Sequence, residues 1–373
     1  MKRSLEDDQP NKIHVKGEEM DYSSSDSENE MYVPNPEDKE LAVDMDVYDV
    51  FYELNTPWPC LTFGIQQSKN KKEFPWNMEI IAGGSSNEKL SDIYQIKLSQ
   101  IFEVPEEEDP FTEPTYECST SKITGDITRI KLSDDLTGIL AKQFEIRSKN
   151  KSIFTMDANE GFGLEYIHND WLVGTNDGIL KHVQHTKSGY LQRDIATTNS
   201  SIEDIKASPN EQTVFATAQG EGYVNIWDTR LNEAGLSKQV ALCDVNVIDW
   251  NKSASLMLMG LDDGSIDIYD LRSLDESLAH YEWHKSPINA VEWHPYDSTT
   301  FAACSDEQVT VWDCAVEEGD QQIVSETTEV PPQLMFIHQG QECIRDIHWH
   351  NTYGCLISSA LSGFNVFKTF NME

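Results

Sequence analysis

The sequence predicts an all-β fold, a closed β-propeller of seven four-stranded blades, and three observations support this prediction. The 373-residue chain repeats a pattern of short alternating strands whose last strand ends in an aromatic residue followed by Asp. The repeat length lies within the roughly 40 to 45 residues that are typical of WD-repeat blades. Seven copies can be recognised between residues 78 and 368. A single propeller is therefore favoured over two unrelated domains of average length.

Three adjacent copies carry the clearest signal. They end in Trp227-Asp228, Tyr269-Asp270 and Trp312-Asp313, so successive copies are 42 and 43 residues apart. In the middle copy we expect strands at 247–250, 256–260 and 265–269, with an Asp-Gly hairpin turn at 263–264. Weaker copies at 78–98, 126–144, 171–183 and 344–368 complete the seven blades.

The last copy contains only three strands, whereas a blade needs four. The missing strand must come from another part of the chain. The unassigned alternating segment is WPCLTFGI at 58–65, with Leu61, Phe63 and Ile65 on one face. Two alternatives remain open, since this segment can close the last blade or open the first one. Either arrangement leaves only short strand edges exposed.

The segments before the propeller are predicted from composition and periodicity. Residues 1–38 are rich in acidic residues and poor in large apolar ones, so we expect a disordered acidic tail. Within it, Ser25 and Ser27 each precede a Glu by three residues, which suits acid-directed phosphorylation as well as a plain solvated run. Residues 39–56 are predicted to form an N-terminal helix packed on the propeller, and residues 57–373 the propeller itself.

The predicted helix has two apolar faces at helical spacing. Between residues 41 and 54, one arc holds Leu41, Met45, Tyr48 and Tyr52, and the nearly opposite arc holds Val43, Val47, Val50, Phe51 and Leu54. A helix on the surface of a domain needs only one apolar face for docking. The second face is therefore covered either by loops of the same chain or by a partner.

Charge and motif content narrow the function classes. Asp and Glu number 65 against 28 Lys and Arg, a formal net charge of −37, which predicts attraction to a basic protein and no direct binding of nucleic acid. No apolar run is long enough for a signal peptide or a membrane span, so we expect a soluble intracellular monomer. The seven cysteines lack a CxxC pair, and no nucleotide-binding or hydrolase motif occurs. We predict no disulfide, no metal, no cofactor and no enzymatic activity.

An acidic insertion precedes the seventh blade. Residues 316–333 separate the two last repeats and contain no Lys or Arg. Pro331-Pro332 stand near the end of this segment. Its acidic residues are Glu317, Glu318, Asp320, Glu326 and Glu329. Such a run is often only a solvated loop. Because blade seven meets the N-terminal segment at ring closure, the loop can also wall a groove beside the predicted helix, which would suit a basic amphipathic helix.

Two further groups of residues have alternative interpretations. His348 and His350 flank Trp349 on a strand, as metal ligands can, but hydrogen bonding within the blade is the simpler interpretation. Arg230 and Arg272 follow aromatic-Asp pairs in WDTR and YDLR, which resembles the docking box of cullin ubiquitin-ligase substrate receptors. The same arginines can simply pair with nearby acids at the blade ends.

The two ends of the propeller region resemble one family. MYVPNPEDKELAVDMDVYDVFYELNTPWPCLTF near the start, and VPPQLMFIHQGQECIRDIHWHNTYGCLISSALSGFNVFKTF near the end, look like the glutamate-rich WD-repeat protein of ribosome biogenesis. This family is similar to the retinoblastoma-binding histone chaperones, which hold a histone helix between a helix and a diproline loop. The resemblance implies a nuclear and nucleolar chaperone of the basic ribosomal protein L-three. It also implies a groove formed by Val47, Val50 and Phe51 together with 317–332.

Three functions of different class remain open at this point. The first is an escort of ribosomal protein L-three in assembly of the large ribosomal subunit. The second is a histone-binding chromatin subunit, with core histones as partners. The third is a substrate receptor of a cullin ubiquitin ligase, in which Arg230 and Arg272 contact the adaptor.

Overall fold

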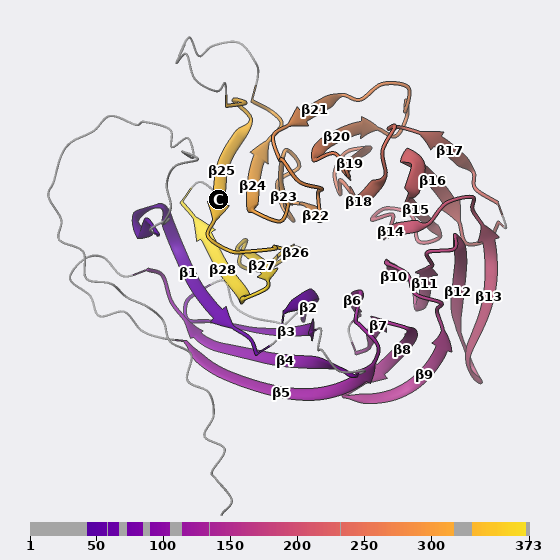
Figure 1. The fold of residues 1–373 in the computed structure, drawn as a ribbon, viewed down its shortest axis with the longest axis horizontal. Coiled ribbons are helices and arrows are strands. Elements are labelled where there is room, and N and C mark those ends of the chain that lie inside the picture. The colour runs from indigo at the N-terminus through magenta and orange to yellow at the C-terminus, as the bar shows by residue number, and fades with distance from the viewer. Residues whose placement is uncertain are drawn as a thin grey trace, which may run out of the picture.

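A computed structural model describes residues 43–57, 59–66, 73–84, 90–104, 114–133, 135–231, 233–316 and 330–370. Seven four-stranded antiparallel sheets surround a central channel (Figure 1). The predicted seven-bladed propeller is confirmed. The expected acidic tail at 1–38, including Ser25 and Ser27, lies outside the described residues. No helix in the described part of the chain is long and apolar enough to cross a membrane.

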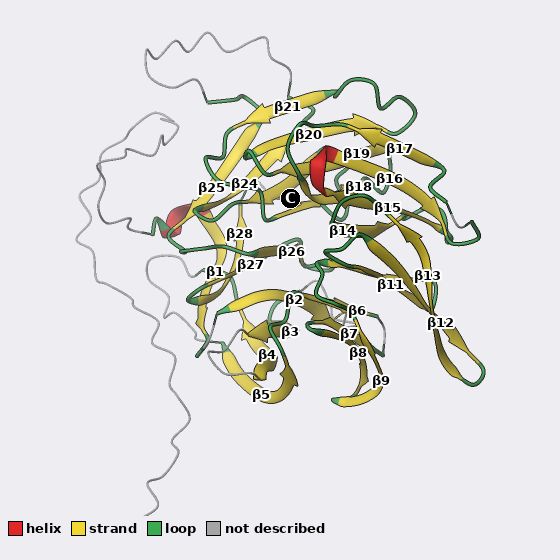
Figure 2. Ribbon diagram, turned by 45° about the vertical axis from the view of Figure 1, so that its right-hand side comes forward, coloured by secondary structure: helices red, strands yellow, loops and turns green. Residues whose placement is uncertain are grey.

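Each blade consists of four consecutive strands, except the last one. Blade 1 holds β2 (Cys60–Gln66), β3 (Trp76–Gly84), β4 (Leu90–Ile101) and β5 (Thr115–Thr124); blade 2 holds β6 (Arg129–Leu132), β7 (Thr137–Leu140), β8 (Gln143–Ser148) and β9 (Lys151–Asp157); blade 3 holds β10 (Gly163–Ile167), β11 (Asp170–Gly174), β12 (Ile179–Thr186) and β13 (Gly189–Thr197); blade 4 holds β14 (Ile202–Ala207), β15 (Val214–Gln219), β16 (Tyr223–Asp228) and β17 (Leu236–Gln239). Blade 5 holds β18 (Val245–Trp250), β19 (Leu256–Leu261), β20 (Ser265–Asp270) and β21 (Ala279–Glu282); blade 6 holds β22 (Ala290–Trp293), β23 (Thr300–Cys304), β24 (Gln308–Asp313) and β25 (Leu334–Gln339); blade 7 holds β26 (Asp346–Trp349), β27 (Leu356–Ala360), β28 (Gly363–Thr369) and β1 (Tyr48–Asn55). Short 3-10 helices are η1 (Met45–Val47) and η2 (Gly220–Gly222). In Figure 2 the β12–β13 hairpin of blade 3 extends beyond its neighbours.

The blades pack face to face through apolar and aromatic side chains. Between blades 5 and 6, the Tyr281 ring of blade 5 lies 4.8 Å from the Trp312 ring of blade 6, which in turn stacks on Phe301 with ring centroids 6.1 Å apart. The predicted turn at 263–264 is present. Gly264 has a φ of +89°, and a Cβ there would lie 2.7 Å from the carbonyl oxygen of His284, so only glycine fits this turn.

Ring closure joins the two ends of the propeller. Strand β1 pairs antiparallel with β28, with Phe51 opposite Phe367 and Leu54 opposite Phe364. Blade 7 therefore consists of three C-terminal strands and one N-terminal strand. The segment 58–65 does not close this blade, because β2 is the first strand of blade 1. Of the two arrangements that the sequence allows for the segment 58–65, the structure shows the one in which it opens the first blade.

The predicted helix at 39–56 is wrong for the described residues. Only η1 is helical, with the Asp44 carboxylate accepting a hydrogen bond from the Asp46 amide at 3.1 Å, and an eight-residue strand follows. The apolar residues of this segment fit both the helical period of 3.6 residues and the strand period of 2. Val50, Tyr52 and Leu54 alternate with exposed Glu53 and enter the core between blades 7 and 1. β-branched and aromatic residues with a free strand edge to pair with favour the extended form.

Side-chain carboxylates connect the inner strands of neighbouring blades. Each accepts a hydrogen bond from a backbone N–H of the next blade: Asp204 from Ile248 at 3.2 Å, Asp249 from Trp293 at 2.9 Å, Glu292 from Trp349 at 3.2 Å, and Asp346 from Phe63 at 3.3 Å. The last of these contacts crosses the ring closure, from blade 7 to blade 1. The ring is therefore held at its inner edge by charge-assisted hydrogen bonds as well as by the β1–β28 pairing.

Candidate functional site

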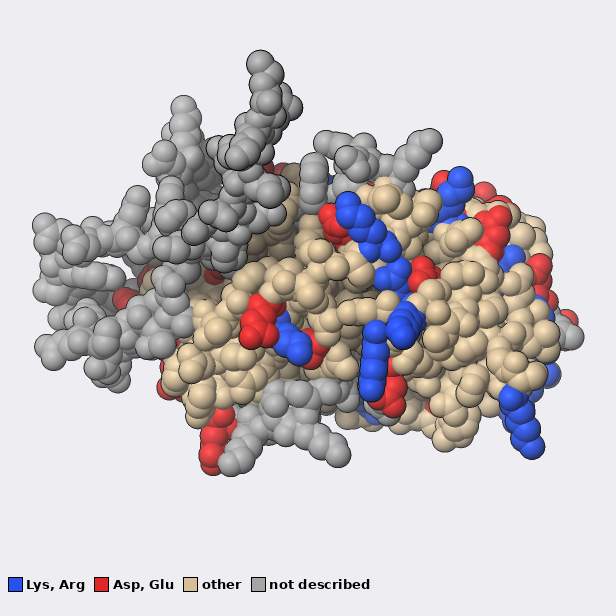
Figure 3. All heavy atoms as spheres, turned by 90° about the horizontal axis from the view of Figure 1, so that it is seen from below, with Lys and Arg blue, Asp and Glu red and all other residues tan. Residues whose placement is uncertain are grey.

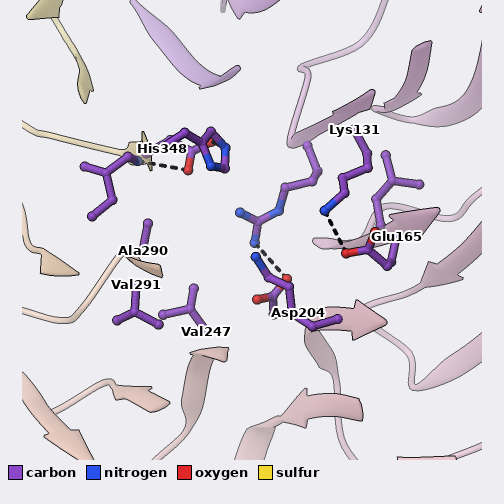
Figure 4. Close-up of a pocket in the computed structure, with 12 residues that line it drawn as sticks. Lys131, Glu165, Asp204, Val247, Ala290, Val291 and His348 are labelled. Atoms are coloured by element: carbon purple, nitrogen blue, oxygen red, sulfur yellow. Dashed lines mark hydrogen bonds and ion pairs between the residues drawn. The ribbon is translucent and has the colours of Figure 1, made fainter. Parts of the chain in front are cut away.

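The central channel is filled mainly by paired charges. Side chains from several blades point into one cavity (Figure 4). Its volume of about 30 Å³ is far smaller than the roughly 300–1,000 Å³ of ligand pockets. Lys131 Nζ lies 2.8 Å from a Glu165 oxygen, and an Arg129 nitrogen lies 3.7 Å from Asp204. These contacts link blades 2, 3 and 4. The channel therefore stabilises the ring rather than offering room for a substrate.

The two histidines singled out in the sequence have separate roles in the structure. His348 lies between Glu292, at 2.8 Å, and Asp346, at 3.6 Å. Burial disfavours its charged form, but these two carboxylates outweigh burial and raise the pKa of His348 to about 9. His350 instead stacks on Tyr353, and its Nδ1 accepts hydrogen bonds from backbone amides. Both rings are held by contacts within the propeller.

The ring closure produces a second surface, which we call the closure rim. It consists of Met45, Tyr48, Val104 and Phe336, which are partly buried against the core between blades 6 and 7. These side chains come from η1, from the start of β1, from the segment after β4 and from β25. Val104 lies in the acidic stretch EVPEEEDPFTE at 103–113, and the acidic insertion at 316–333 directly precedes β25, which carries Phe336.

Aromatic contacts hold the closing strand against blade 6. The Tyr48 ring meets Phe336 edge-on at 5.6 Å and lies 4.9 Å from Phe51. The Tyr48 hydroxyl is 2.8 Å from His338 Nδ1, while Asn365 Nδ2 is 3.1 Å from the other ring nitrogen. Because the amide nitrogen can only donate, the neutral ring carries its proton on Nδ1 and donates it to the Tyr48 oxygen.

Burial sets the protonation of this contact. It lowers the pKa of His338 to about 3, so the imidazole is neutral at physiological pH. Burial, followed by the nearby Asp44 carboxylate, raises the pKa of Tyr48 well above its ordinary value. Both groups are therefore neutral, and the hydrogen bond between them persists across the physiological range.

The structure separates the predicted helix residues of the site. Val50 is fully buried in the core, and Phe51 is only 8 % exposed, since it packs under Tyr48. Val47 in η1 is half-buried. Of the three, only Val47 is placed where a partner can reach it without displacing core side chains.

The predicted loop residues are described only in part. Pro331 is half-buried and Pro332 is exposed, and the Pro331 carbonyl accepts a hydrogen bond from the Leu334 amide at 3.0 Å as β25 begins. This strand carries Phe336 and His338, so the diproline leads directly into the closure rim. The five acidic positions lie outside the described residues: Glu317, Glu318, Asp320, Glu326 and Glu329.

Sequence reasoning missed the residues that connect the rim. Helical spacing places Tyr48 on the face opposite Phe51, and nothing in the IHQG segment indicates that His338 meets it. The strand pairing β1–β28 and the packing of blade 6 bring them together. The one local signal is the strict alternation of Val50, Tyr52 and Leu54, which predicts a strand and places Tyr48 on its outer part.

The two segments that carry Tyr48 and Phe336 contain no positively charged residue among those described. Residues 43–57 contain Asp44, Asp46, Asp49 and Glu53 and no Lys or Arg, and β25 has no charged residue at all. Asp44, which caps η1, and Asp46, which lies within it, are both exposed. The described part of the rim is thus an apolar strip bordered by carboxylates.

The charge of the propeller is unevenly distributed. Among the described residues, blades 1–3 hold 14 Asp and Glu against 11 Lys and Arg, whereas blades 4–7 hold 26 against 8. Figure 3, which views the edge that carries β5 and β9, shows Lys and Arg side chains along it. The closure rim belongs to the acidic part of the ring, so the field of the protein directs cations toward it.

Arg230 and Arg272 follow the third strands of two adjacent blades, β16 of blade 4 and β20 of blade 5. Each folds back on the Asp two residues before it, through Nε and Nη2 to both carboxylate oxygens. Their side chains are 73 % and 77 % exposed. The contacts match the predicted alternative in which these arginines pair with nearby acids.

Comparisons with known proteins agree with the fold. The family model described as "Nucleolar protein 10-like, N-terminal domain", a β-propeller, matches residues 169–340. The chain is 28 % identical to "Ribosome assembly protein rrb1" of Schizosaccharomyces pombe, over 89 % of this chain and 82 % of that one. It is also 28 % identical to "Glutamate-rich WD repeat-containing protein 1" of Dictyostelium discoideum, over 91 % and 84 %. Similarity to "Histone acetyltransferase type B subunit 2" of Candida glabrata is lower, 23 % over 84 % and 83 %. The resemblance to glutamate-rich WD-repeat proteins predicted from the sequence is confirmed.

Proposed function

We propose that this chain, a WD-repeat propeller similar to ribosome assembly proteins, is a non-catalytic escort of a basic ribosomal protein in assembly of the large subunit. The observation that carries the proposal is the closure rim, an apolar strip bordered by the exposed carboxylates of Asp44 and Asp46. We take ribosomal protein L-three as the cargo, as the sequence resemblance implies. The same relatives, and the nucleolar name of the matching family model, support action in the nucleus and nucleolus.

The chemistry of the rim suits a cationic amphipathic segment. Apolar side chains of such a segment can cover Met45, Val47 and Phe336, which leaves its Lys and Arg side chains facing Asp44 and Asp46. The acidic segment at 317–329 adds five carboxylates next to the diproline. Shielding of such cationic surface keeps a basic protein from non-specific association before it reaches its RNA.

We also propose that the protein catalyses no reaction. The channel holds ion pairs instead of a substrate-sized cavity, and the relatives bear names of assembly factors and binding subunits. We therefore assign the protein to binding and release.

Affinity for purified ribosomal protein L-three tests the proposal. The full-length chain is compared with the Asp44→Lys/Asp46→Lys double variant at 75 and 300 mM salt. We expect the double variant to bind about tenfold more weakly at the lower salt, because each lost close charge pair contributes on the order of 0.5–1 kcal/mol. The loop variant Glu317→Lys/Glu318→Lys/Asp320→Lys is expected to weaken binding in the same direction.

A matched control separates the rim from bulk charge. Glu211→Lys/Glu233→Lys changes the net charge equally at exposed positions of blade 4. We expect its affinity to stay within about threefold of the wild type. Equal losses in both double variants would assign the binding to net charge alone and remove the rim from the proposal.

The histone-binding alternative is supported by the weaker similarity to the acetyltransferase subunit. The same binding assay with a histone H3–H4 preparation distinguishes the two functions. Tighter binding of histones than of ribosomal protein L-three would favour the alternative and contradict the escort function.

A further inference from the structure

Strand β1 contacts three blades, although it is far from two of them in sequence. It pairs with β28 of blade 7 along its whole length. The Asp49 carbonyl accepts a hydrogen bond from the Val104 amide of blade 1 at 2.8 Å, and the Tyr52 hydroxyl lies 3.2 Å from the Phe102 carbonyl oxygen. Tyr48 contacts His338 of blade 6. Detachment of β1 therefore removes contacts of blades 6, 7 and 1 together.

The closure rim exists only while β1 is attached. Met45 and Tyr48 reach the rim because η1 and β1 lie beside β25, where Tyr48 covers Phe51 and meets Phe336. Without β1 the remaining rim residues belong to separate blades. The apolar strip and the carboxylates of 44–49 are then no longer in one place.

The opposite end of β1 is fixed by a close backbone contact. Gly363 begins β28 with a φ of +134°, and a Cβ there would lie 2.0 Å from the Leu54 carbonyl oxygen. The Thr56 amide donates to the Ser362 carbonyl oxygen at 3.2 Å. This end lies about 20 Å from Tyr48, given a rise of roughly 3.3 Å per residue.

We infer that ring closure and assembly of the closure rim are one cooperative step, so that a partner bound across β1 and β25 clamps the ring and release of β1 releases the partner. The part of the inference that concerns the partner rests on the proposed function. Its structural half, the coupling of ring closure to assembly of the closure rim, concerns the free protein alone. By linkage, a ligand that binds only the closed ring stabilises closure, and anything that opens the ring lowers apparent affinity in proportion to the closed fraction.

Amide hydrogen exchange of the free full-length protein tests the structural half. Gly363→Ala places a methyl group against Leu54 at the far end of the strand, while Gly189→Ala is the matched control, since Gly189 has a φ of +124° but open space around it. We expect Gly363→Ala to accelerate exchange of the Phe51 and Glu53 amides and of the β25 amides by tenfold or more. The control leaves these amides within about twofold of the wild type.

Faster exchange confined to residues 53–56, with the β25 amides unchanged, would show that the strand frays at one end and would overturn the inference. Faster exchange in all seven blades alike would also overturn it, because it reports global unfolding instead of release of β1. A second variant, Leu54→Ala, shortens a buried side chain at the same end and must reproduce the pattern.

Purified ribosomal protein L-three tests the coupling to a partner. At a concentration 100 times its dissociation constant, exchange of the β1 amides is expected to slow by about 100-fold, and Gly363→Ala is expected to weaken binding although no rim residue is altered. Binding that leaves β1 exchange unchanged contradicts the clamp. A complete lack of binding to the wild type contradicts the proposed function instead, while the exchange pattern of the free variants still decides the cooperative step.

Discussion

Tyr48 and His338 meet across the ring closure, with the phenol oxygen 2.8 Å from the imidazole Nδ1. Tyr48 belongs to the N-terminal strand that completes blade 7, and His338 to the outer strand of blade 6. His338 is almost fully buried and stacks on Phe367 with ring centroids 4.0 Å apart. The hydrogen bond links the first described strand to the sixth blade, and the stacking on Phe367 adds the last described strand, β28, to the same contact.

Removal of this hydrogen bond tests its contribution to stability. Tyr48→Phe keeps the aromatic packing but leaves a buried imidazole N–H without its acceptor, which costs about 1–2 kcal/mol of unfolding free energy. Urea unfolding measures the change. The control Tyr223→Phe removes a hydroxyl that makes no hydrogen bond among the described residues, and we expect a change below about 0.5 kcal/mol. Equal effects of both variants would mean that the hydroxyl contact with His338 contributes nothing.

The repeat could be predicted from the sequence because its signal is local and periodic. The aromatic-Asp pairs at 227–228, 269–270 and 312–313 each end the third strand of a blade, and the predicted strands at 247–250, 256–260 and 265–269 lie within β18, β19 and β20. Each blade contains its own hydrophobic alternation and hairpin turns, so adjacent residues suffice to identify it.

The ring closure could not be predicted in the same way. The segment 41–54 is apolar at both helical and strand spacing, and the choice between them depends on the free edge of β28, which is more than 300 residues away in sequence. The carboxylate contacts between blades depend likewise on the proximity of inner strands. Net charge predicted a basic partner, whereas the uneven distribution of charge around the ring required the three-dimensional arrangement.

The carboxylate of Asp346 is expected to be one of the strongest single contributions to ring closure. It accepts hydrogen bonds from the Phe63 amide, the Thr62 hydroxyl and the Ile347 amide. Burial alone would raise the pKa of Asp346, but His348 and the hydrogen bond from Thr62 outweigh burial and help to lower this pKa to about 2. Asp346→Asn replaces an acceptor oxygen by a donor in a buried site, and we expect a loss of about 3 kcal/mol.

An exposed ion pair provides the control for this variant. Asp275 contacts Lys238 at 2.9 Å, but its side chain is 85 % exposed. Asp275→Asn is expected to change the unfolding free energy by less than about 0.5 kcal/mol, because water screens the pair. Chemical unfolding of both variants compares them, and a loss for Asp346→Asn as small as that for Asp275→Asn would contradict the role of the inner carboxylates.

The raised pKa of His348 predicts a dependence of stability on pH. The folded state holds the proton more tightly than the unfolded chain, with a pKa of about 9 against about 6.5. Its contribution is therefore complete below about pH 6.5 and is lost as the pH rises through 9. We expect the stability advantage of the wild type over His348→Gln to fall by about 1–2 kcal/mol across this pH window. The change is modest because the imidazole of His348 remains partly exposed to the channel.

Parallel unfolding curves at pH 6.5 and 9 measure this difference. His185→Gln, at an exposed position of β12, is the control and is expected to show the same pH dependence as the wild type. A difference between wild type and His348→Gln that stays constant with pH would mean that the two carboxylates do not hold a charged imidazole.

Arg230 and Arg272 distinguish an intramolecular role from contact with a ubiquitin-ligase adaptor. Each guanidinium is engaged by its own Asp, and these contacts lower the pKa of Asp228 and of Asp270 to about 2. Because the pairs are largely exposed, Arg230→Ala and Arg272→Ala are expected to leave stability and capture of ribosomal protein L-three unchanged, which unfolding and binding assays measure.

An adaptor that requires the arginines must displace the aspartates or bind around the existing pair. Binding of a purified cullin adaptor to the wild type, lost in both variants while L-three binding is retained, would establish the third function, and its absence would leave the arginines as partners of their aspartates.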